Sequence, residues 1–447
     1  MGLEIGSLEA PPPLPRHPLK EYQGSKKLKL VSCGLTEFPR EILDHGESLE
    51  TVDLSGNPIS ELPSDFGRLQ NLKIAFFSDC NFTVFPKQLA QCPSLEMVAF
   101  KNNQMTTVPE GAFPPKLRWL ILTNNLITSL PSSIGKCQRL QKCMLAGNKL
   151  VALPDEMAKC QKLGLLRISA NEIESLPDWL FSLQELSFLA FAGNPCSSSL
   201  EDRPVLDDIA WTELTVSDVL GEGASGIISK GTWSANGEEK HVAVKFFKNG
   251  ITSDGSPDDE MHACITAGSH PSLIDTFGKV QGHPDREGLV LQLIPAHYKN
   301  LGLPPTLKSC TRDAFPRETA FSVEKCRNVL LSIAAAALHL HSRGVSHGDL
   351  YAHNILIDEQ GNALLGDFGA ATIYRKSHAK AGAIERLEVL AFGHLIEDML
   401  GLLDSGRFSR KKGYIIDVLH RLHYRCTRPA VKDRPLFDEI YNTLNGL

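Results

Sequence analysis

The sequence contains no apolar run long enough to cross a membrane, and residues 1–20 lack the charged-then-apolar order of a secretory signal peptide. It also has little excess charge, because 46 basic and 52 acidic side chains leave a formal net charge of -6. Its 11 cysteines form no C-x-x-C pair, so neither a disulfide framework nor a zinc site is indicated. We therefore expect a cytoplasmic protein with reduced thiols, no membrane span and no nucleic-acid partner.

The length of 447 residues exceeds what one hydrophobic core ordinarily holds, so two domains are expected. Apolar residues make up 42% and charged residues 22% of the chain, which is typical of globular proteins. The two halves carry different sequence patterns, and each pattern predicts a different architecture.

Prolines recur at intervals of 22 to 24 residues through the first half, together with the template L-x-x-L-x-L-x-x-N. One copy reads Leu117, Leu120, Leu122 and Asn125. The last column of the template predicts eight repeats and is occupied by Cys33, Asn57, Cys80, Asn103, Asn125, Asn148, Asn171 and Asn194. Alternate leucines would face one interior, and the Asn amide would satisfy backbone groups where the chain turns out of each strand.

The repeats resemble the leucine-rich repeat family, which implies a curved α/β solenoid that binds a protein on its concave face. Strand alternation places a row of large apolar side chains at outward positions of that face. Such a row is more typical of a covered surface than of a free one. The second domain or a terminal segment could cover it. We favour a protein substrate or regulator bound to Phe76, Met97, Trp119, Met144 and Phe188.

The second half opens its pattern with Gly221, Gly223 and Gly226, which form a G-x-G-x-x-G motif. Glycines of this kind let the backbone of a hairpin approach phosphate oxygens. The motif alone is weak evidence, and its weight comes from the motifs that follow it in order.

An alternating apolar stretch at 242–244 leads to Lys245, and a lysine on a strand can hold the α- and β-phosphates of a nucleotide. A carboxylate from a downstream helix is expected to pair with this lysine. We assign Glu260 to that role, with Asp259 and Asp258 as alternatives because the preceding segment is loop-rich.

A buried helix predicted at 329–340 precedes Asp349, and Asn354 and Asp367 follow at spacings of five and thirteen residues. Phosphoryl transfer needs an aspartate that orients the attacking hydroxyl and oxygen ligands for magnesium. Each of these residues alone is more typical of a cap or a surface position. Their order and spacing together predict that chemistry.

These motifs resemble the eukaryotic-type protein kinase family, and the closing segment around Arg434 resembles its tyrosine-kinase-like branch. The resemblance implies a two-lobed α+β kinase fold that uses ATP and Mg²⁺. It implies as catalytic residues Asp349, Lys245 and Glu260, and as metal ligands Asn354 and Asp367. The implied ATP-binding residues are Leu220, Gly221, Gly223, Gly226, Ile228, Ala243, Lys245 and Leu291.

The two resemblances predict a domain organisation. It consists of an N-terminal tail at 1–25, a leucine-rich repeat solenoid at 26–195, a linker at 196–210 and a kinase domain at 211–447. The linker follows from the end of the repeat template after Asn194 and from the short, acidic segment that comes next.

The second half departs from the kinase family at the catalytic loop. Gly348 replaces an arginine that reads a phosphate on the activation segment, so phosphorylation there is not expected to be the switch. Tyr351 and His353 stand where family members carry a lysine or an arginine that neutralises the transferred phosphate. Loss of that cation is expected to slow transfer by about 10²-fold or more.

The segment after the catalytic loop departs from the family too. Glu388 follows Asp367 by only 21 positions, and the segment between them contains no A-P-E motif. The activation segment is therefore expected to be short, and Arg434 to lack its usual glutamate partner. The next helix is expected to begin at Glu388, in place of the family's aspartate.

The sequence favours a serine/threonine protein kinase whose solenoid recruits substrates or regulators. Two alternatives stay open. The first is a pseudokinase scaffold that binds nucleotide and acts through its repeats. The second is a small-molecule phosphotransferase, because H-G-D-x-x-x-x-N also occurs in choline and aminoglycoside kinases.

Overall fold

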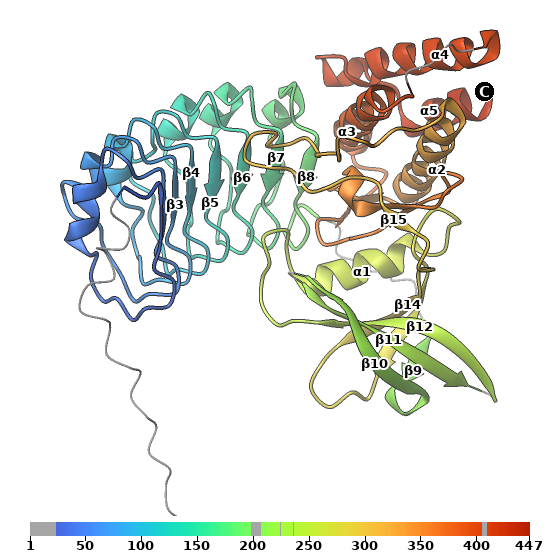
Figure 1. Ribbon diagram of the computed structural model, residues 1–447, viewed down its shortest axis with the longest axis horizontal. Helices are drawn as coiled ribbons and strands as arrows, with labels where there is room; N and C mark the ends of the chain where they lie inside the picture. The colour runs from blue at the N-terminus through green and yellow to red at the C-terminus, as the bar shows by residue number, and fades with distance from the viewer. Residues whose placement is uncertain (1–23, 198–206, 224, 236, 405–408) are drawn as a thin grey trace, which may run out of the picture.

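The computed structural model describes residues 24–197, 207–223, 225–235, 237–404 and 409–447, so almost all of the tail predicted at 1–25 lies outside the described residues. Figure 1 shows two parts side by side, a curved stack of short strands and a mixed domain of sheet and helices. A solenoid followed by an α+β domain is the architecture that the sequence predicts.

The solenoid has one sheet of eight strands, which pair in parallel and in sequence order. The strands are β1 (Lys27–Lys29), β2 (Thr51–Asp53), β3 (Ile74–Phe76), β4 (Met97–Ala99), β5 (Trp119–Ile121), β6 (Lys142–Met144), β7 (Leu165–Arg167) and β8 (Phe188–Ala190). Opposite the strands lie 3-10 helices at Arg40–His45, Phe66–Arg68, Lys87–Gln91, Ser132–Lys136, Asp155–Lys159 and Asp178–Ser182 (Figure 1). The middle residue of every strand is buried, so stacking closes one continuous core.

The asparagine column performs the predicted task. The buried Asn125 amide donates to the carbonyls of Phe100 and Leu122 at 2.9 and 3.0 Å, and its oxygen accepts from Met105 N at 3.1 Å. Equivalent bonds recur at Asn148 and at other members of the column. Each side chain therefore satisfies backbone groups of two neighbouring repeats that burial would otherwise leave unpaired.

The second part begins with a six-stranded sheet in the order β10-β11-β12-β14-β13-β9. Its elements are β9 (Asp208–Ala210), β10 (Leu214–Glu222), β11 (Gly226–Ala235), β12 (Glu238–Phe247), β13 (Thr276–Gln281) and β14 (Gly288–Gln292), with helix α1 (Pro257–Ala267). β9 pairs in parallel with β13, so the last three residues of the linker drawn at 196–210 belong to this sheet. Met261 of α1 packs with Phe247 and Leu289 of the sheet.

The rest of the domain is mainly helical. Its helices are α2 (Val323–Ser342), α3 (Ala381–Gly401), α4 (Arg410–Cys426) and α5 (Phe437–Asn445), with 3-10 turns at Ala352–Asn354 and Val431–Asp433. Its short strands are β15 (Lys299–Asn300), β16 (Val345–Ser346), β17 (Ile355–Ile357), β18 (Ala363–Leu365) and β19 (Thr372–Ile373). The helix predicted at 329–340 lies inside α2, and α3 begins at Ala381 rather than at Glu388. In the described part of the chain, no helix combines the length and apolarity needed to span a membrane.

The two parts share their hydrophobic cores. Leu165 and Phe188 of the solenoid belong to the core of the helical region, while Tyr374, Ile384 and Leu387 of the second part pack into the core of the repeats. Figure 1 shows the last strands of the solenoid lying against this region, and α3 packs on β8. Merged apolar cores are typical of permanent interfaces.

Candidate active site

A cleft lies between the six-stranded sheet and the helical region. Five of the predicted ATP-binding residues line it, namely Gly223, Gly226, Ile228, Lys245 and Leu291. The other three, Leu220, Gly221 and Ala243, are not among its lining residues. Leu220 is exposed on β10, and Ala243 is buried opposite Leu291 in the sheet. The glycine loop, the lysine and an apolar wall thus meet at one cleft.

Other lining residues carry no motif in the sequence. They are Thr252, Asp254, Cys264, Ile274, Thr276 and Leu289. These residues come from the loop before α1, from α1 and from the strands and loops after it. No sequence motif identifies these residues as part of a binding site, because they come from separate segments that meet only in the folded chain.

The glycine hairpin between β10 and β11 is closed by a hydrogen bond of 2.9 Å from Gly223 N to Gly226 O. A Cβ at Gly226 would lie 2.5 Å from Phe246 O, so only glycine lets the backbone approach β12 here. A Cβ at Gly223 would meet no atom within 4 Å. The backbone of the hairpin is therefore open to the cleft, where its N–H groups can approach phosphate oxygens.

Lys245 on β12 forms an ion pair with Glu260 on α1. Glu260 lies in the first turn of α1, since Ser256 caps that helix and Pro257 begins it. Burial alone would lower the pKa of Lys245, but the Glu260 carboxylate outweighs burial and raises it, so the lysine stays charged. Of the three acids considered from the sequence, Glu260 is the one that makes this pair.

Asp349 and Asn354 are joined within the loop that follows α2. The Asn354 amide donates to the carbonyl of Asp349 at 3.0 Å and to its Oδ2 at 2.8 Å. The buried His347 ring accepts from Asp349 N at 3.3 Å, and its Nε2 lies 2.9 Å from the carbonyl of Gly366. Burial raises the pKa of Asp349, and the Arg167 guanidinium opposes that rise. The loop therefore holds one carboxylate oxygen of Asp349 in a defined orientation.

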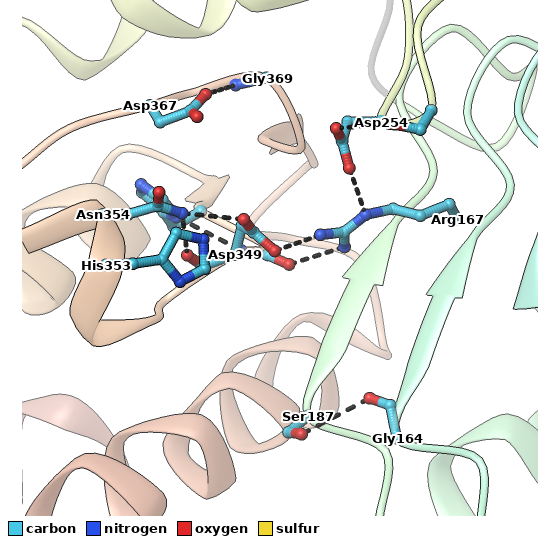
Figure 2. A network of polar contacts seen from close by, with 12 residues as sticks. Gly164, Arg167, Ser187, Asp254, Asp349, His353, Asn354, Asp367 and Gly369 are labelled. Carbon is cyan, nitrogen blue, oxygen red and sulfur yellow. Dashed lines mark hydrogen bonds and ion pairs between the residues drawn. The ribbon is translucent and has the colours of Figure 1, made fainter. Parts of the chain in front are cut away.

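Asp367 lies across the site from Asn354, and its Oδ1 accepts from Gly369 N at 3.2 Å (Figure 2). The Asn354 amide nitrogen is used by Asp349, so its amide oxygen is available as a metal ligand. Within the described ranges, no group of three or more His, Cys, Asp or Glu side chains could hold a metal alone. Asp367 and Asn354 each offer a side-chain oxygen here, which is the ligand type that a divalent cation prefers.

An arginine of the solenoid reaches this loop (Figure 2). The Arg167 guanidinium on β7 forms an ion pair with Asp349 through Nη2 and donates to the carbonyl of Gly348 through Nη1 at 2.8 Å. Its Nε donates to Asp254 Oδ1 at 2.8 Å. Burial would lower the pKa of Arg167, but the two carboxylates raise it. A buried, charged guanidinium thus links the repeats to the catalytic loop.

Sequence reasoning missed Arg167. The available signal was a basic residue at an outward strand position beside large apolar side chains, together with a loop that carries Tyr351 and His353 where the resembled family has a cation. Neither observation alone shows that the two segments meet.

The second domain covers part of the outward row of the solenoid. Phe188 is buried, and its ring stacks on Tyr351 with 3.8 Å between ring centroids. Met144 packs against the core of the helical region, and the Trp119 indole donates to Cys310 Sγ. The chain itself therefore covers Phe188, which argues against a separate partner at that position, whereas Met144 and Trp119 are only half-buried and their assignment as partner contacts stays a prediction.

The remaining two predicted partner contacts lie further toward the N-terminal end of the solenoid. Phe76 on β3 is half-buried, and Met97 on β4 is buried. Their assignment as partner contacts stays a prediction.

Gly348 has a backbone that favours glycine, with φ at 71°. A Cβ here would lie 2.5 Å from the carbonyl of Ala370 and 2.9 Å from that of Leu189 on β8. An arginine at this position would therefore collide with the solenoid as well as with its own domain. The absence of the family's arginine has a steric reason.

A Gly348→Ala variant is expected to lower the free energy of unfolding by about 1–3 kcal/mol, from backbone strain and from the overlap with both carbonyls. Gly237→Ala is the matched control, because Gly237 has φ at 82° and no atom within 4 Å of a built Cβ. The control should lose only about 1 kcal/mol. If denaturant titrations gave equal losses in the free energy of unfolding for the two variants, close packing of the solenoid against Gly348 would be ruled out as the cause.

Two family models match the chain. Residues 214–390 match the model described as protein tyrosine and serine/threonine kinase, and residues 48–69 and 116–137 match the leucine-rich repeat model. A leucine-rich repeat protein of Leptospira interrogans with a solved structure is 28% identical, with a TM-score of 0.34, over 36% of this chain and 41% of that one.

Curated relatives include two probable serine/threonine-protein kinases of Dictyostelium discoideum. One is 30% identical over 169 residues, which is 37% of this chain and 9% of the relative. The other is 24% identical over 276 residues, which is 54% of this chain and 28% of the relative. The matched regions thus span less than a third of the length of either relative.

Proposed function

Because the chain joins leucine-rich repeats to a protein kinase domain, we propose that it transfers the γ-phosphoryl group of ATP to serine or threonine hydroxyls of other proteins. The observation that carries this proposal is the ion pair of Lys245 and Glu260 at a cleft that Asp367 also lines. Asp349 and Asn354 are hydrogen-bonded to each other beside it. The names of the two Dictyostelium relatives support the preference for serine and threonine.

ATP with magnesium, when bound, would supply the phosphoryl group and much of the charge neutralisation that its transfer needs. Lys245 would bind phosphate oxygens, and Glu260 would keep the ammonium group in place. Asn354 and Asp367 would hold the metal ion through their side-chain oxygens. Gly223 would let the hairpin backbone lie over the phosphates.

Asp349 would orient the acceptor hydroxyl and take its proton as the new oxygen–phosphorus bond forms and the bond from the γ-phosphorus to the bridging oxygen of ADP breaks. Asn354 binds its Oδ2 and Arg167 contacts its Oδ1, so the plane of the carboxylate is set before substrate arrives. The Asp349 side chain is only 18% exposed, which limits competition from water.

The segment between Asp367 and α3 is proposed to be a shortened activation segment. Phe191 N of the solenoid donates to Thr372 Oγ1 at 3.0 Å, so the repeats contact this segment directly. Position 348 is glycine, and no arginine is available there to read a phosphate. This arrangement supports activity without phosphorylation of the segment.

A scaffold that binds nucleotide without transferring phosphate is the second candidate. The observation that favours it is Tyr351, whose ring is buried under Phe188 at a position where family members carry a cation. Phosphoryl transfer separates the two candidates directly, whereas nucleotide binding is expected of both.

The test uses the full chain with γ-labelled ATP, magnesium and a mixed protein substrate, followed by identification of the labelled amino acids. Wild type should label serine and threonine. Lys245→Met should lose at least ~10²-fold in transfer, because a cation at the phosphates is removed. Lys240→Met, an exposed position on the same strand, should behave as wild type.

Undiminished transfer by Lys245→Met would contradict the assigned phosphate contact. Label found on tyrosine would contradict the serine/threonine preference. An inert wild type that still binds ATP in a thermal-shift assay would favour the scaffold.

A further inference from the structure

Arg167 belongs to the repeats, yet its guanidinium ends at the loop that carries Asp349 (Figure 2). The side chain is 1% exposed and makes polar contacts with Asp349, Gly348 and Asp254. An arginine that is buried this completely requires its partners, because an unpaired charge in such a place is costly. The Arg167 guanidinium therefore fixes the loop at residues 347–354, and that loop in turn holds the guanidinium in place.

The catalytic loop needs this cation. The carboxylates of Asp254 and Asp367 lie near enough to act on Asp349, and both add negative charge where phosphate oxygens would gather. The basic side chain of the loop itself, His353, has its Nδ1 2.7 Å from Asp313 Oδ1. Among the residues that the structure describes, Arg167 is the cation in ion-pair contact with Asp349, and the charge of His353 acts on it as a lesser contribution.

The contact is part of a permanent interface rather than a removable plug. Phe188 stacks on Tyr351 within a shared core, and the Arg434 guanidinium donates to the carbonyl of Gln184 across the same boundary at 2.9 Å. Gly348 has no Cβ, so the solenoid backbone can lie directly against the loop. A regulatory segment that must leave the site would have to break a merged apolar core.

We propose that Arg167, on repeat strand β7, is a positioning residue of the phosphoryl-transfer site and that the solenoid is thereby part of the active site. The proposal rests on the function proposed above, in which Asp349 orients the acceptor hydroxyl. Arg167 fixes Oδ1 while Asn354 fixes Oδ2, so both carboxylate oxygens of Asp349 have a set direction. A lysine carries the charge but not the planar fork that spans three acceptors.

The test compares Arg167→Ala and Arg167→Lys with wild type in the labelled-ATP assay, with kcat and KM for ATP measured separately. Arg167→Ala should lower kcat by about 10²-fold and leave KM for ATP unchanged. Added guanidinium ion, at non-denaturing concentration, should restore part of kcat in Arg167→Ala and nothing in wild type. Arg167→Lys should fall between the two.

Arg434→Lys is the matched control, because Arg434 is an equally buried guanidinium at the same interface that does not contact Asp349. It should keep the wild-type kcat. If Arg167→Ala fails to fold, the double variant Arg167→Ala with Asp254→Asn removes one of the carboxylates left unpaired, and guanidinium rescue is then measured on that variant.

Three results would overturn the inference while leaving the proposed function in place. An unchanged kcat in Arg167→Ala would show that the contact is not used. A higher kcat would show that the arginine blocks the base. A loss that guanidinium does not restore, matched by Arg434→Lys, would show a purely structural role. A wild type that transfers no phosphate would overturn the proposed function and this inference together.

Discussion

An Asp349→Asn variant is expected to lose transfer by about 10³-fold while its affinity for ATP with magnesium stays at the wild-type value. A positioned general base contributes about 10²- to 10⁴-fold to such a step. Asparagine has nearly the same shape as aspartate, but its one amide oxygen can accept from Asn354 or from Arg167 and not from both, so part of the loss would come from the altered contact with Arg167. Asp349 is not among the residues that line the cleft, which is why nucleotide binding should persist.

The measurement pairs a transfer assay with nucleotide titration of the same preparation. Asp417→Asn provides the control, since Asp417 is an exposed residue of α4 that undergoes the same chemical change. The control should match wild type in both assays. Transfer by Asp349→Asn within a few-fold of wild type would show that another group takes the proton, and weaker nucleotide binding would show that the loop had moved.

The residues that sequence reasoning found share one property. Lys245, Asp349, Asn354 and Asp367 each belong to a motif whose spacing is set by local geometry, such as a strand or a tight loop. Glu260 was one of three neighbouring acids that the sequence left open, and the capped first turn of α1 selects it. Local geometry of this kind is encoded in short-range sequence spacing. The five residues therefore lie near one another in the structure, as the sequence predicts.

No sequence pattern predicts the contacts between the repeats and the second domain. Arg167 and Asp349 are 182 residues apart, and no period in either half predicts how one packs on the other. The outward row of the solenoid indicated a covered surface, but its composition does not say whether the cover is a partner or the same chain. In the folded chain, the Tyr351 ring of the second domain covers Phe188, a contact that the sequence alone does not reveal.

Departures from the kinase family were the most informative positions. The interpretation of Gly348 as the loss of a phosphate reader stays a prediction, and the fold adds a steric reason in the approach of β8. Arg434, expected to lack its usual glutamate partner, donates to the carbonyls of Arg428, Arg386 and Gln184. Both positions depart from the kinase pattern where the second domain contacts the solenoid.

Glu388 is a further departure with a structural task. It was expected at the start of a helix, but it lies within α3 with its side chain 3% exposed. Its Oε1 accepts from Gly348 N at 2.7 Å and its Oε2 from His347 N at 3.3 Å, and Oε2 is 2.6 Å from His341 Nε2. One carboxylate therefore anchors the residues that precede Asp349.

Replacing Glu388 by Ala is expected to lower the free energy of unfolding by about 3–5 kcal/mol, because it leaves buried N–H groups and a buried histidine without their acceptor. Glu388→Gln keeps an acceptor oxygen and should lose less. Glu397→Ala, on the same helix with its side chain 53% exposed, is the control and should lose no more than about 1 kcal/mol.

The charge of Glu388 should also make the free energy of unfolding depend on pH. Burial would raise the pKa of Glu388, but the hydrogen bond and the charge of His341 outweigh it, and the pKa lies below its ordinary value of 4.5. The charged carboxylate thus stabilises the fold fully above pH 4.5, and this contribution fades as the pH falls through the lower folded-state pKa. Wild type should therefore lose its advantage over Glu388→Gln in acid. A constant difference from pH 7 down into acid would show that Glu388 acts by its shape and not by its charge.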